Sequence, residues 1–142
     1  MTHPTVVARI RFAQEQDESA LNLGDLGDVV LAEIPEEILS LKKLTTLKLN
    51  DGGLKSLPPW FYRLQTLENL DLSGNQLADL PEGLAQLTQL QSFDVSGNQL
   101  TALPEGLAQL TQLQSLDVSH NQLTALPEWL PQLTQLQNLD VS

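Results

Sequence analysis

The chain has 142 residues, of which 41% are hydrophobic and 18% charged, a length and composition that predict one folded domain and exclude general disorder. Because cysteine is absent and histidine occurs only twice, disulfide scaffolds, cysteine-ligated zinc and thiol nucleophiles are excluded, and little is left for base catalysis. The net charge is −11, from 18 acidic and 7 basic residues, and no Lys or Arg follows Arg63, so we expect neither a nucleic acid nor a membrane as partner.

The first predicted element is an amphipathic helix from Pro4 to Gln16. Its apolar residues recur at helical spacing: Val6, Val7, Ile10 and Ala13. A strand is the rival interpretation, because apolar and basic residues alternate from Ala8 to Phe12. We favour a helix that covers the open end of the following core, so that residues 1–19 form an N-terminal helical cap. A membrane-binding helix is disfavoured, since its only cations are Arg9 and Arg11.

From residue 20 onward the chain is an internal repeat. Full units start at residues 41, 64, 87 and 110, which is a period of 23. The units 87–109 and 110–132 differ only at Phe93/Leu116, Gly97/His120, Gly106/Trp129 and Ala108/Pro131. We assign an irregular unit to 20–40, a degenerate unit to 41–63, regular units to 64–86, 87–109 and 110–132, and a partial unit to 133–142. The irregular unit has three extra residues, within 28–30, that we expect to loop out.

Each unit is predicted to contain a short strand, a loop and a return segment. Apolar and polar residues alternate at 93–95, which is typical of a strand with one buried face. The leucines that follow are spaced by three and four residues, which favours irregular or 3₁₀ structure: Leu100, Leu103 and Leu107. Pro104 lacks an N–H and ends any ladder of hydrogen bonds there. One unit cannot bury its own leucines, so the units must stack around a continuous core.

The units read LxxLxxLxLxxNxLxxLPxxLxx, which resembles the leucine-rich repeat proteins over about residues 20–142. The 23-residue spacing and the Leu-Pro pair resemble the intracellular Ras-group repeats and the repeat arrays of bacterial Roco proteins. The resemblance implies an α/β solenoid with a short parallel sheet on its concave face, an irregular or 3₁₀ convex side and the N-terminal helical cap. It implies that the leucines of each unit form the core, in one unit Leu67, Leu70, Leu72, Leu77, Leu80 and Leu84.

The resemblance also implies a structural asparagine ladder. Three asparagines occupy the position that is asparagine in the family's repeat pattern, where a buried amide bonds main-chain groups of neighbouring turns: Asn75, Asn98 and Asn121. Gly52 holds that position in the degenerate unit, so the ladder is expected to be weak there.

The concave face is the candidate partner-binding surface. Residues that flank the buried strand residue point outward, and we expect this face to present Lys48, Asn69, Asp71, Ser92, Asp94, Ser115, Asp117, Asn138 and Asp140. Four of these are aspartates that form a column with a spacing of about 4.8 Å. One interpretation is a surface selected to bind a basic protein or a small GTPase. The other is that Asp belongs to the ordinary repeat pattern and that the acidic surface keeps the protein solvated.

Other residues that could take part in binding or catalysis have simpler, structural interpretations. Trp60 and Trp129 stand where the middle units have glycine, and each is either an interface anchor or packs on the neighbouring turn, which we favour. His120 lies near Asp117, but without a second histidine or a cysteine a metal site is disfavoured. No phosphate-binding loop, dinucleotide fingerprint or nucleophile elbow occurs, so we predict no enzyme and no cofactor.

The leading functional hypothesis is therefore a non-catalytic protein–protein interaction module that binds through its acidic concave face. The alternative is a regulatory or scaffold region of a larger bacterial GTPase, Roco-like, or of an effector whose catalytic part lies beyond residue 142. The chain ends inside a strand, and we expect Leu126, Leu133, Leu136 and Leu139 to be left open there, so either more chain follows or another molecule covers them. Weak self-association through that edge is a further expectation. A cytoplasmic location is predicted, because there is no signal peptide and no Asn-x-Ser/Thr sequon.

Overall fold

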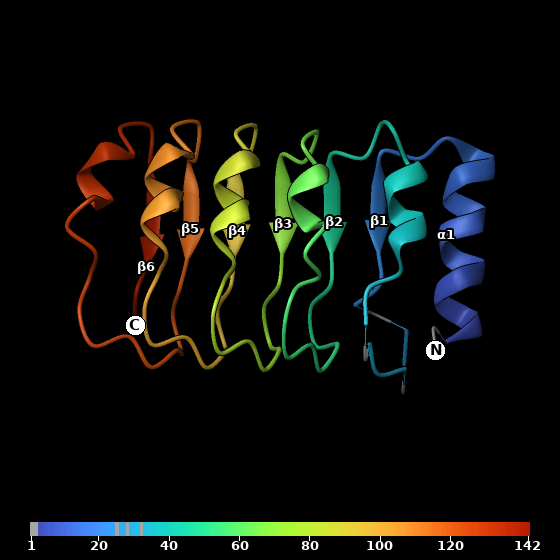
Figure 1. Ribbon diagram of the computed structural model, residues 1–142, viewed down its shortest axis with the longest axis horizontal. Helices are drawn as coiled ribbons and strands as arrows, with labels where there is room; N and C mark the ends of the chain where they lie inside the picture. The colour runs from blue at the N-terminus through green and yellow to red at the C-terminus, as the bar shows by residue number, and fades with distance from the viewer. Residues whose placement is uncertain (1–2, 25, 28, 32) are drawn as a thin grey trace.

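Stacked coils of chain form a solenoid in the computed structural model, which describes residues 3–24, 26–27, 29–31 and 33–142 (Figure 1). Each coil gives one strand to a parallel sheet in which sequence neighbours are spatial neighbours, in the order β1 to β6. The strands are β1 Ala20–Asn22, β2 Thr46–Lys48, β3 Asn69–Asp71, β4 Ser92–Asp94, β5 Ser115–Asp117 and β6 Asn138–Asp140. The predicted fold class, an α/β leucine-rich repeat solenoid, is confirmed.

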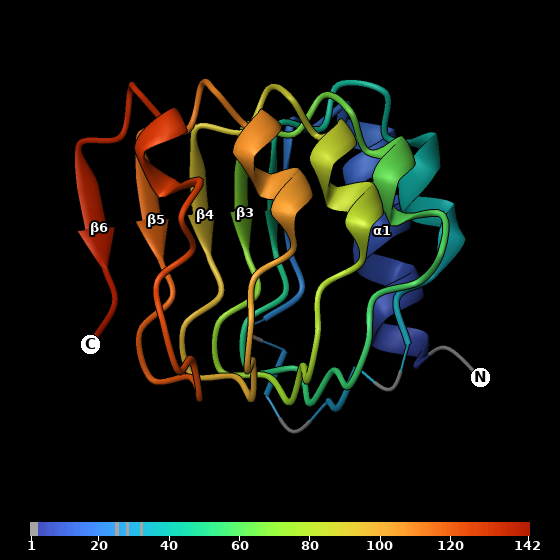
Figure 2. The same ribbon diagram turned by 60° about the vertical axis from the view of Figure 1, so that its left-hand side comes forward.

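Short 3₁₀ helices form the layer opposite the sheet, which Figure 2 shows from the side. They are η1 Glu36–Ser40, η2 Phe61–Arg63, η3 Glu82–Gln86, η4 Glu105–Gln109 and η5 Leu130–Gln132. A proline opens the segment that leads to each helix, and its fixed φ and missing N–H prevent a second strand from forming there. The return segment is therefore 3₁₀ helix and loop, as the leucine spacing predicts.

The N-terminal segment is the helix α1, Pro4–Gln16, and the strand interpretation is wrong. His3 caps it, since its Nδ1 accepts a hydrogen bond from the Thr5 N–H at 3.2 Å, and Pro4 takes the first helical position, where no N–H is needed. Asp17 ends the helix in the left-handed conformation, with φ at 53°. The helix buries Val6, Ile10 and Ala13 against the first coil, and it covers that end of the core (Figure 1).

The core is one continuous stack of leucine-rich layers. The central residue of each strand from β1 to β5 is buried: Leu21, Leu47, Leu70, Phe93 and Leu116. All six leucines implied as core in the unit 64–86 are buried. None of the helices in the described ranges is long and apolar enough to cross a lipid bilayer.

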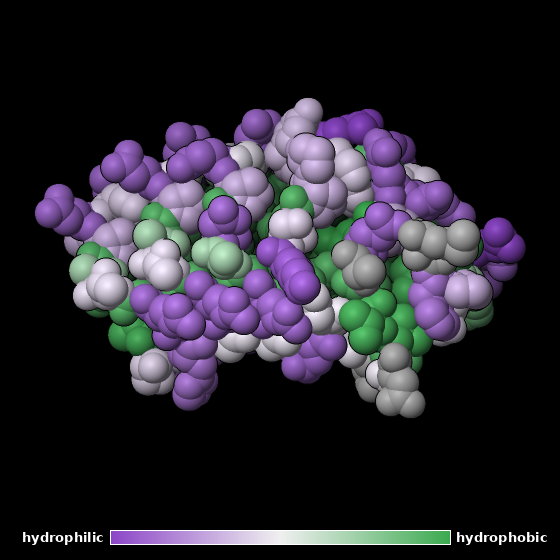
Figure 3. Space-filling model, turned by 60° about the horizontal axis from the view of Figure 1, so that its bottom comes forward, coloured by the Kyte–Doolittle hydropathy of each residue, from purple (hydrophilic) through white to green (hydrophobic). Residues whose placement is uncertain are grey.

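The irregular first unit bulges where its extra residues lie. Val30 is 68% exposed and Val29 half-buried, while Leu31 returns to the core and its N–H donates to the Gly52 carbonyl at 2.7 Å. The extra chain therefore loops out at Val29 and Val30, and Asp28 lies outside the described residues. Figure 3 shows that the edge below the strands is mostly polar, with a larger apolar area toward the N-terminal end and smaller ones at the C-terminal end.

The opposite end of the stack is less covered. Leu139 and Val141 are 40% and 44% exposed, and Leu126 is 51% exposed. Leu136 is half-buried. The prediction that Leu133 lies open is wrong, because Leu133 closes the 3₁₀ helix η5 and is buried against the unit before it.

Candidate functional site

Strand register places the predicted concave residues in two neighbouring columns. Cα pairing along the sheet aligns the residue after each central strand residue: Asn22, Lys48, Asp71, Asp94, Asp117 and Asp140. The residue before it forms the second column: Ala20, Thr46, Asn69, Ser92, Ser115 and Asn138. All nine predicted partner-binding residues thus lie on one face, and they are partly or fully exposed.

Each aspartate of the column uses one carboxylate oxygen to hold its own turn. Oδ1 of Asp94 accepts from the Ser96 N–H at 2.9 Å and from the Ser96 hydroxyl at 2.6 Å. The same pair of bonds recurs in the other three units, from Ser73 to Asp71, Ser119 to Asp117 and Ser142 to Asp140. No hydrogen bond reaches any of the four Oδ2 atoms within the described part of the chain. The carboxylates are therefore fixed by one oxygen and free to accept from a partner with the other.

In the last unit the serine bonds stabilise the ionised carboxylate. At Asp140 the Ser142 hydroxyl, and then the Ser142 N–H, lower the pKa of the side chain below its ordinary value. Asp140 is therefore ionised throughout the neutral range and contributes a full negative charge at the last strand.

The column changes sign at its N-terminal end. A concave hollow of about 310 Å³ spans β2 to β4, with Lys48 at one side and Asp71 and Asp94 at the other. In the part of the chain that the structure describes, no ion pair joins Lys48 to these aspartates, since the ion pairs there are Arg9–Glu18, Lys43–Asp17 and Arg63–Glu36. The face thus offers one cation followed by four carboxylates in a row, a polarity that can orient a bound segment.

The asparagines form a ladder beneath this face, in which Asn75 and Asn98 are buried and Asn121 is half-buried. The Asn98 amide donates to the carbonyls of Leu72, Val95 and Ser96, at 3.0, 3.0 and 3.2 Å, and its oxygen accepts from the Leu77 N–H at 3.0 Å. Asn75 and Asn121 repeat the pattern, and the Asn75 oxygen also accepts from the Gly52 N–H at 3.0 Å. Each amide therefore ties its own turn to the turn before it and satisfies main-chain groups that the loop would leave unpaired.

His120 lies at a turn position that glycine occupies in the two preceding units. His120 takes a left-handed conformation, with φ at 53°, where the two preceding units have Gly74 and Gly97 at 66° and 64°. Across residues 3–24, 26–27, 29–31 and 33–142, no group of three His, Cys, Asp or Glu is arranged to hold a metal ion.

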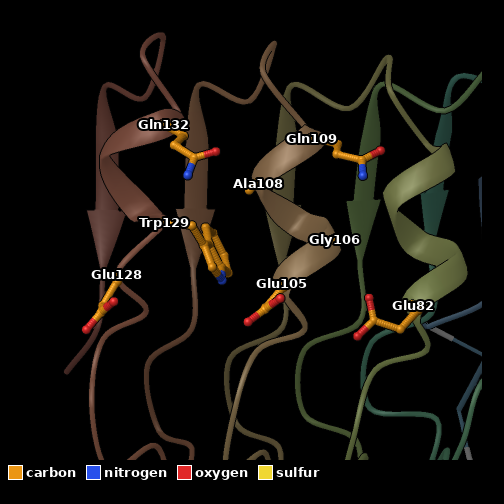
Figure 4. Close-up of a pocket in the computed structure, with 8 residues that line it drawn as sticks. All are labelled: Glu82, Glu105, Gly106, Ala108, Gln109, Glu128, Trp129 and Gln132. Atoms are coloured by element: carbon orange, nitrogen blue, oxygen red, sulfur yellow. The ribbon is translucent and has the colours of Figure 1, made fainter.

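A second acidic surface, which the sequence reading did not identify, lies on the convex side. A hollow of about 770 Å³ is lined by Glu82, Glu105, Gly106, Ala108, Gln109, Glu128, Trp129 and Gln132 (Figure 4). Its three glutamates follow the proline of successive units, so the Pro-Glu pairs at a spacing of 23 were the available signal. Trp129 is only 9% exposed and packs at the η4–η5 junction, as the favoured interpretation predicts, while Trp60 is half-buried.

Comparison with known proteins identifies the family. Residues 42–100 and 88–142 match the family described as Leucine rich repeat, which covers well over half of the chain. No curated protein matches the chain.

Solved structures agree with the family match. An internalin from Listeria monocytogenes has a TM-score of 0.75 at 23% identity, over 92% of this chain and 37% of its own. A leucine-rich repeat protein from Leptospira interrogans has a TM-score of 0.67 at 27% identity, over 92% of this chain and 45% of its own. The leucine-rich repeat ectodomain of the receptor kinase SOBIR1 from Arabidopsis thaliana has a TM-score of 0.72 at 26% identity, over 86% of this chain and 68% of its own.

This chain spans less than half the length of the first two of these structures. The stacked parallel strands, the asparagine ladder and the family match together establish that the chain belongs to the leucine-rich repeat family.

Proposed function

We propose that this chain is a protein–protein interaction module that binds a basic segment of a partner along its acidic concave face. The observation that carries the proposal is the column of four aspartates from Asp71 to Asp140, each with Oδ2 unbonded within the described residues and facing out of the sheet. A rigid sheet holds these acceptors in place before binding, which lowers the entropic cost of association. Proteins of this repeat family commonly mediate protein–protein interaction, and that general role supports the proposal.

The test replaces Asp94 and Asp117 together with asparagine. Asparagine keeps the oxygen that Ser96 and Ser119 bond, so the turns remain and only the outward charge is lost. With basic peptides selected from a displayed library, we expect the affinity of the double variant to fall about fivefold to thirtyfold, the equivalent of 1–2 kcal/mol. The dependence of binding on salt should also become shallower, because exposed charges are screened within about 10 Å at 0.1 M.

A matched control changes two acidic side chains away from both the concave face and the convex hollow. Asp79→Asn with Glu15→Gln removes the same charge from exposed positions, and its affinity and salt dependence should equal those of the unchanged chain. Equal loss in both double variants would mean that net charge alone governs binding, and no loss in the concave variant would refute the concave site.

A second question is whether the repeats act alone or as part of a larger protein. The alternative proposal is that these repeats regulate a catalytic region beyond residue 142, which would be a Roco-like GTPase or an effector. The protein would then act in the cytoplasm of a bacterium, and a small GTPase is among the candidate partners. Its support is the LPxxL unit with a period of 23 and the greater length of the similar structures. The gene sequence past residue 142 decides it, since a phosphate-binding loop there favours regulation and an immediate stop codon favours a free-standing module.

A further proposal is weak self-association of the 142-residue chain through β6. Its outer edge carries unpaired main-chain groups beside the exposed Leu139 and Val141, and such an edge is a template for pairing. Because Asp117 and Asp140 repel a second copy, we expect association to strengthen as salt rises, opposite to binding of a basic partner. Sedimentation across a salt and concentration series measures this. A monomer under all conditions, with hydrogen-exchange protection of residues 136–141, would contradict it.

A further inference from the structure

The two tryptophans occupy equivalent places in the solenoid, three units apart. Adding 69 to a residue number converts the first junction into the second, so that Trp60 corresponds to Trp129, Glu36 to Glu105 and Arg63 to Gln132. The backbone agrees, since Trp60 has φ −86° and ψ −2° and Trp129 has φ −79° and ψ −7°. Each tryptophan directly precedes a three-residue 3₁₀ helix, whereas the glycine units have five-residue helices. The two junctions therefore share one local geometry.

Tryptophan keeps such a junction open. At the glycine junction between η3 and η4, a Cβ on Gly106 would lie 2.8 Å from the Ala85 Cβ, so these helices pack too closely for any side chain there. At the next junction the indole of Trp129 stands between η4 and η5, and the hollow opens around it (Figure 4).

An exposed ion pair of the chain itself bridges the two units of the first junction. Arg63 Nη1 lies 3.3 Å from Glu36 Oε1 and pairs with it across the two units. At the second junction the equivalent of Arg63 is Gln132, which carries no charge, and the equivalent of Glu36 is Glu105. Among the described residues, the side chains of Glu105 and its neighbours Glu82 and Glu128 have no ion pair or hydrogen bond. The second junction thus has the carboxylate that corresponds to Glu36 without the cation that corresponds to Arg63, and it adds two further carboxylates.

The indole adds an unused donor to this hollow. Trp129 is more than nine-tenths buried, but its indole N–H keeps contact with solvent at the hollow, and within the described chain no protein group accepts from it. Figure 4 shows the nitrogen at the end of the ring that faces the row of glutamates. A ligand that fits must offer a cation to the carboxylates, a flat surface to the indole and an acceptor to its N–H. A peptide with an arginine meets all three needs, since guanidinium is planar, pairs with carboxylates and stacks on aromatic rings, and the peptide carbonyl accepts.

We propose that the convex hollow at the η4–η5 junction binds an arginine side chain of a partner polypeptide, in the place that Arg63 takes at the η1–η2 junction. This gives the chain a second binding surface, on the side opposite the concave column. The site is specific to the unit 110–132, because among the regular units only that one has tryptophan in place of glycine.

The direct test follows the indole N–H resonances of the whole chain by ¹H–¹⁵N spectroscopy. The chain has two tryptophans, so each spectrum contains a reporter and an internal control, assigned with Trp60→Phe. A blocked, glycine-flanked arginine peptide should shift the Trp129 resonance and leave that of Trp60 in place. The matched citrulline peptide, which lacks the charge, should shift neither. A Trp129 resonance that does not move with the arginine peptide, or that moves equally with citrulline or with lysine in its place, overturns the proposal.

Variants then separate this hollow from the concave face. Gln132→Arg supplies the guanidinium from within, so it should pair with Glu105, abolish binding of the arginine peptide and leave the spectrum otherwise folded. Gln86→Arg is the matched control, since it makes the same change at the same repeat position outside the hollow, and it should bind as the unchanged chain does. Glu105→Gln should weaken binding about fivefold, the equivalent of a pair worth 1 kcal/mol.

The concave double variant distinguishes failure of this proposal from failure of the proposed function. Asp94→Asn with Asp117→Asn should leave the shift of Trp129 unchanged. If instead it removes all peptide binding while Gln132→Arg removes none, the arginine peptide binds the concave column alone, and the convex site is refuted.

Discussion

Leu116→Ala is expected to lower the free energy of unfolding by about 2–5 kcal/mol, the cost of removing a buried leucine side chain from a packed core. Leu116 is the central residue of β5, is buried, and pairs in register with Phe93 and Leu139. A domain of this kind has a total stability of about 5–15 kcal/mol, so the loss is a large share of it. Because each coil is stabilised by its neighbours, we expect unfolding to extend beyond the unit 110–132.

Thermal and denaturant unfolding of the variant measure the loss, and hydrogen exchange shows how far it extends. Leu126→Ala is the matched control, since Leu126 lies in the same unit but is 51% exposed, and its effect should be a small fraction of the other. A melting curve for Leu116→Ala that coincides with that of the unchanged chain would mean that this strand residue is not part of the core.

Asn98→Ala is expected to be among the most damaging changes of a polar residue. It removes the acceptor of the Leu77 N–H and the donor to the carbonyls of Leu72, Val95 and Ser96, all in the interior or at its edge. Each buried polar group left without a partner costs about 1–3 kcal/mol, so a loss of several kcal/mol is expected unless water enters to replace the amide.

Asn98→Asp tests the reason for this loss. The carboxylate retains an acceptor for the Leu77 N–H but cannot donate to the carbonyls, and it places a charge in a buried position, so it should not rescue stability. Gln99→Ala changes the exposed neighbour and serves as the control. Denaturant unfolding of all three variants measures the differences, and an Asp variant as stable as the unchanged chain would show that the donated bonds are unimportant.

The regular part of this fold could be predicted because each unit constrains the next. The period of 23, together with the alternation of apolar and polar residues around residues 70, 93 and 116, is sufficient to predict where the strands lie. Parallel stacking of the units then implies the register between neighbouring strands. The concave columns follow from that register alone. The N-terminal helix does not follow from the sequence alone, because residues 8–12 also alternate, and packing against the first coil decides in favour of the helix.

The features that the sequence does not predict are those that depend on how neighbouring units pack against each other. Trp129 stands where the unit before it has Gly106, and the sequence therefore shows a larger side chain at this position. It does not show that the 3₁₀ helix that follows is shorter or that a hollow forms at the junction. The burial of Leu133 could not be predicted either, because the sequence does not show that the residue that ends η5 packs into the core. The hydrogen bonds from the serines to the aspartates, by contrast, could have been predicted, since an Asp followed two residues later by Ser is a local turn pattern.

The divided role of the column aspartates affects how this surface can evolve. Asn22, the member of the column in β1, accepts from the Gly24 N–H at 2.9 Å through its own Oδ1, so an amide already performs the turn-holding role there. Asp and Asn codons differ by a single nucleotide, and the exchange alters charge while leaving that bond intact. Each coil can therefore gain or lose one negative charge by a point mutation with little effect on folding. The array as a whole can change its preferred ligand stepwise, one coil at a time.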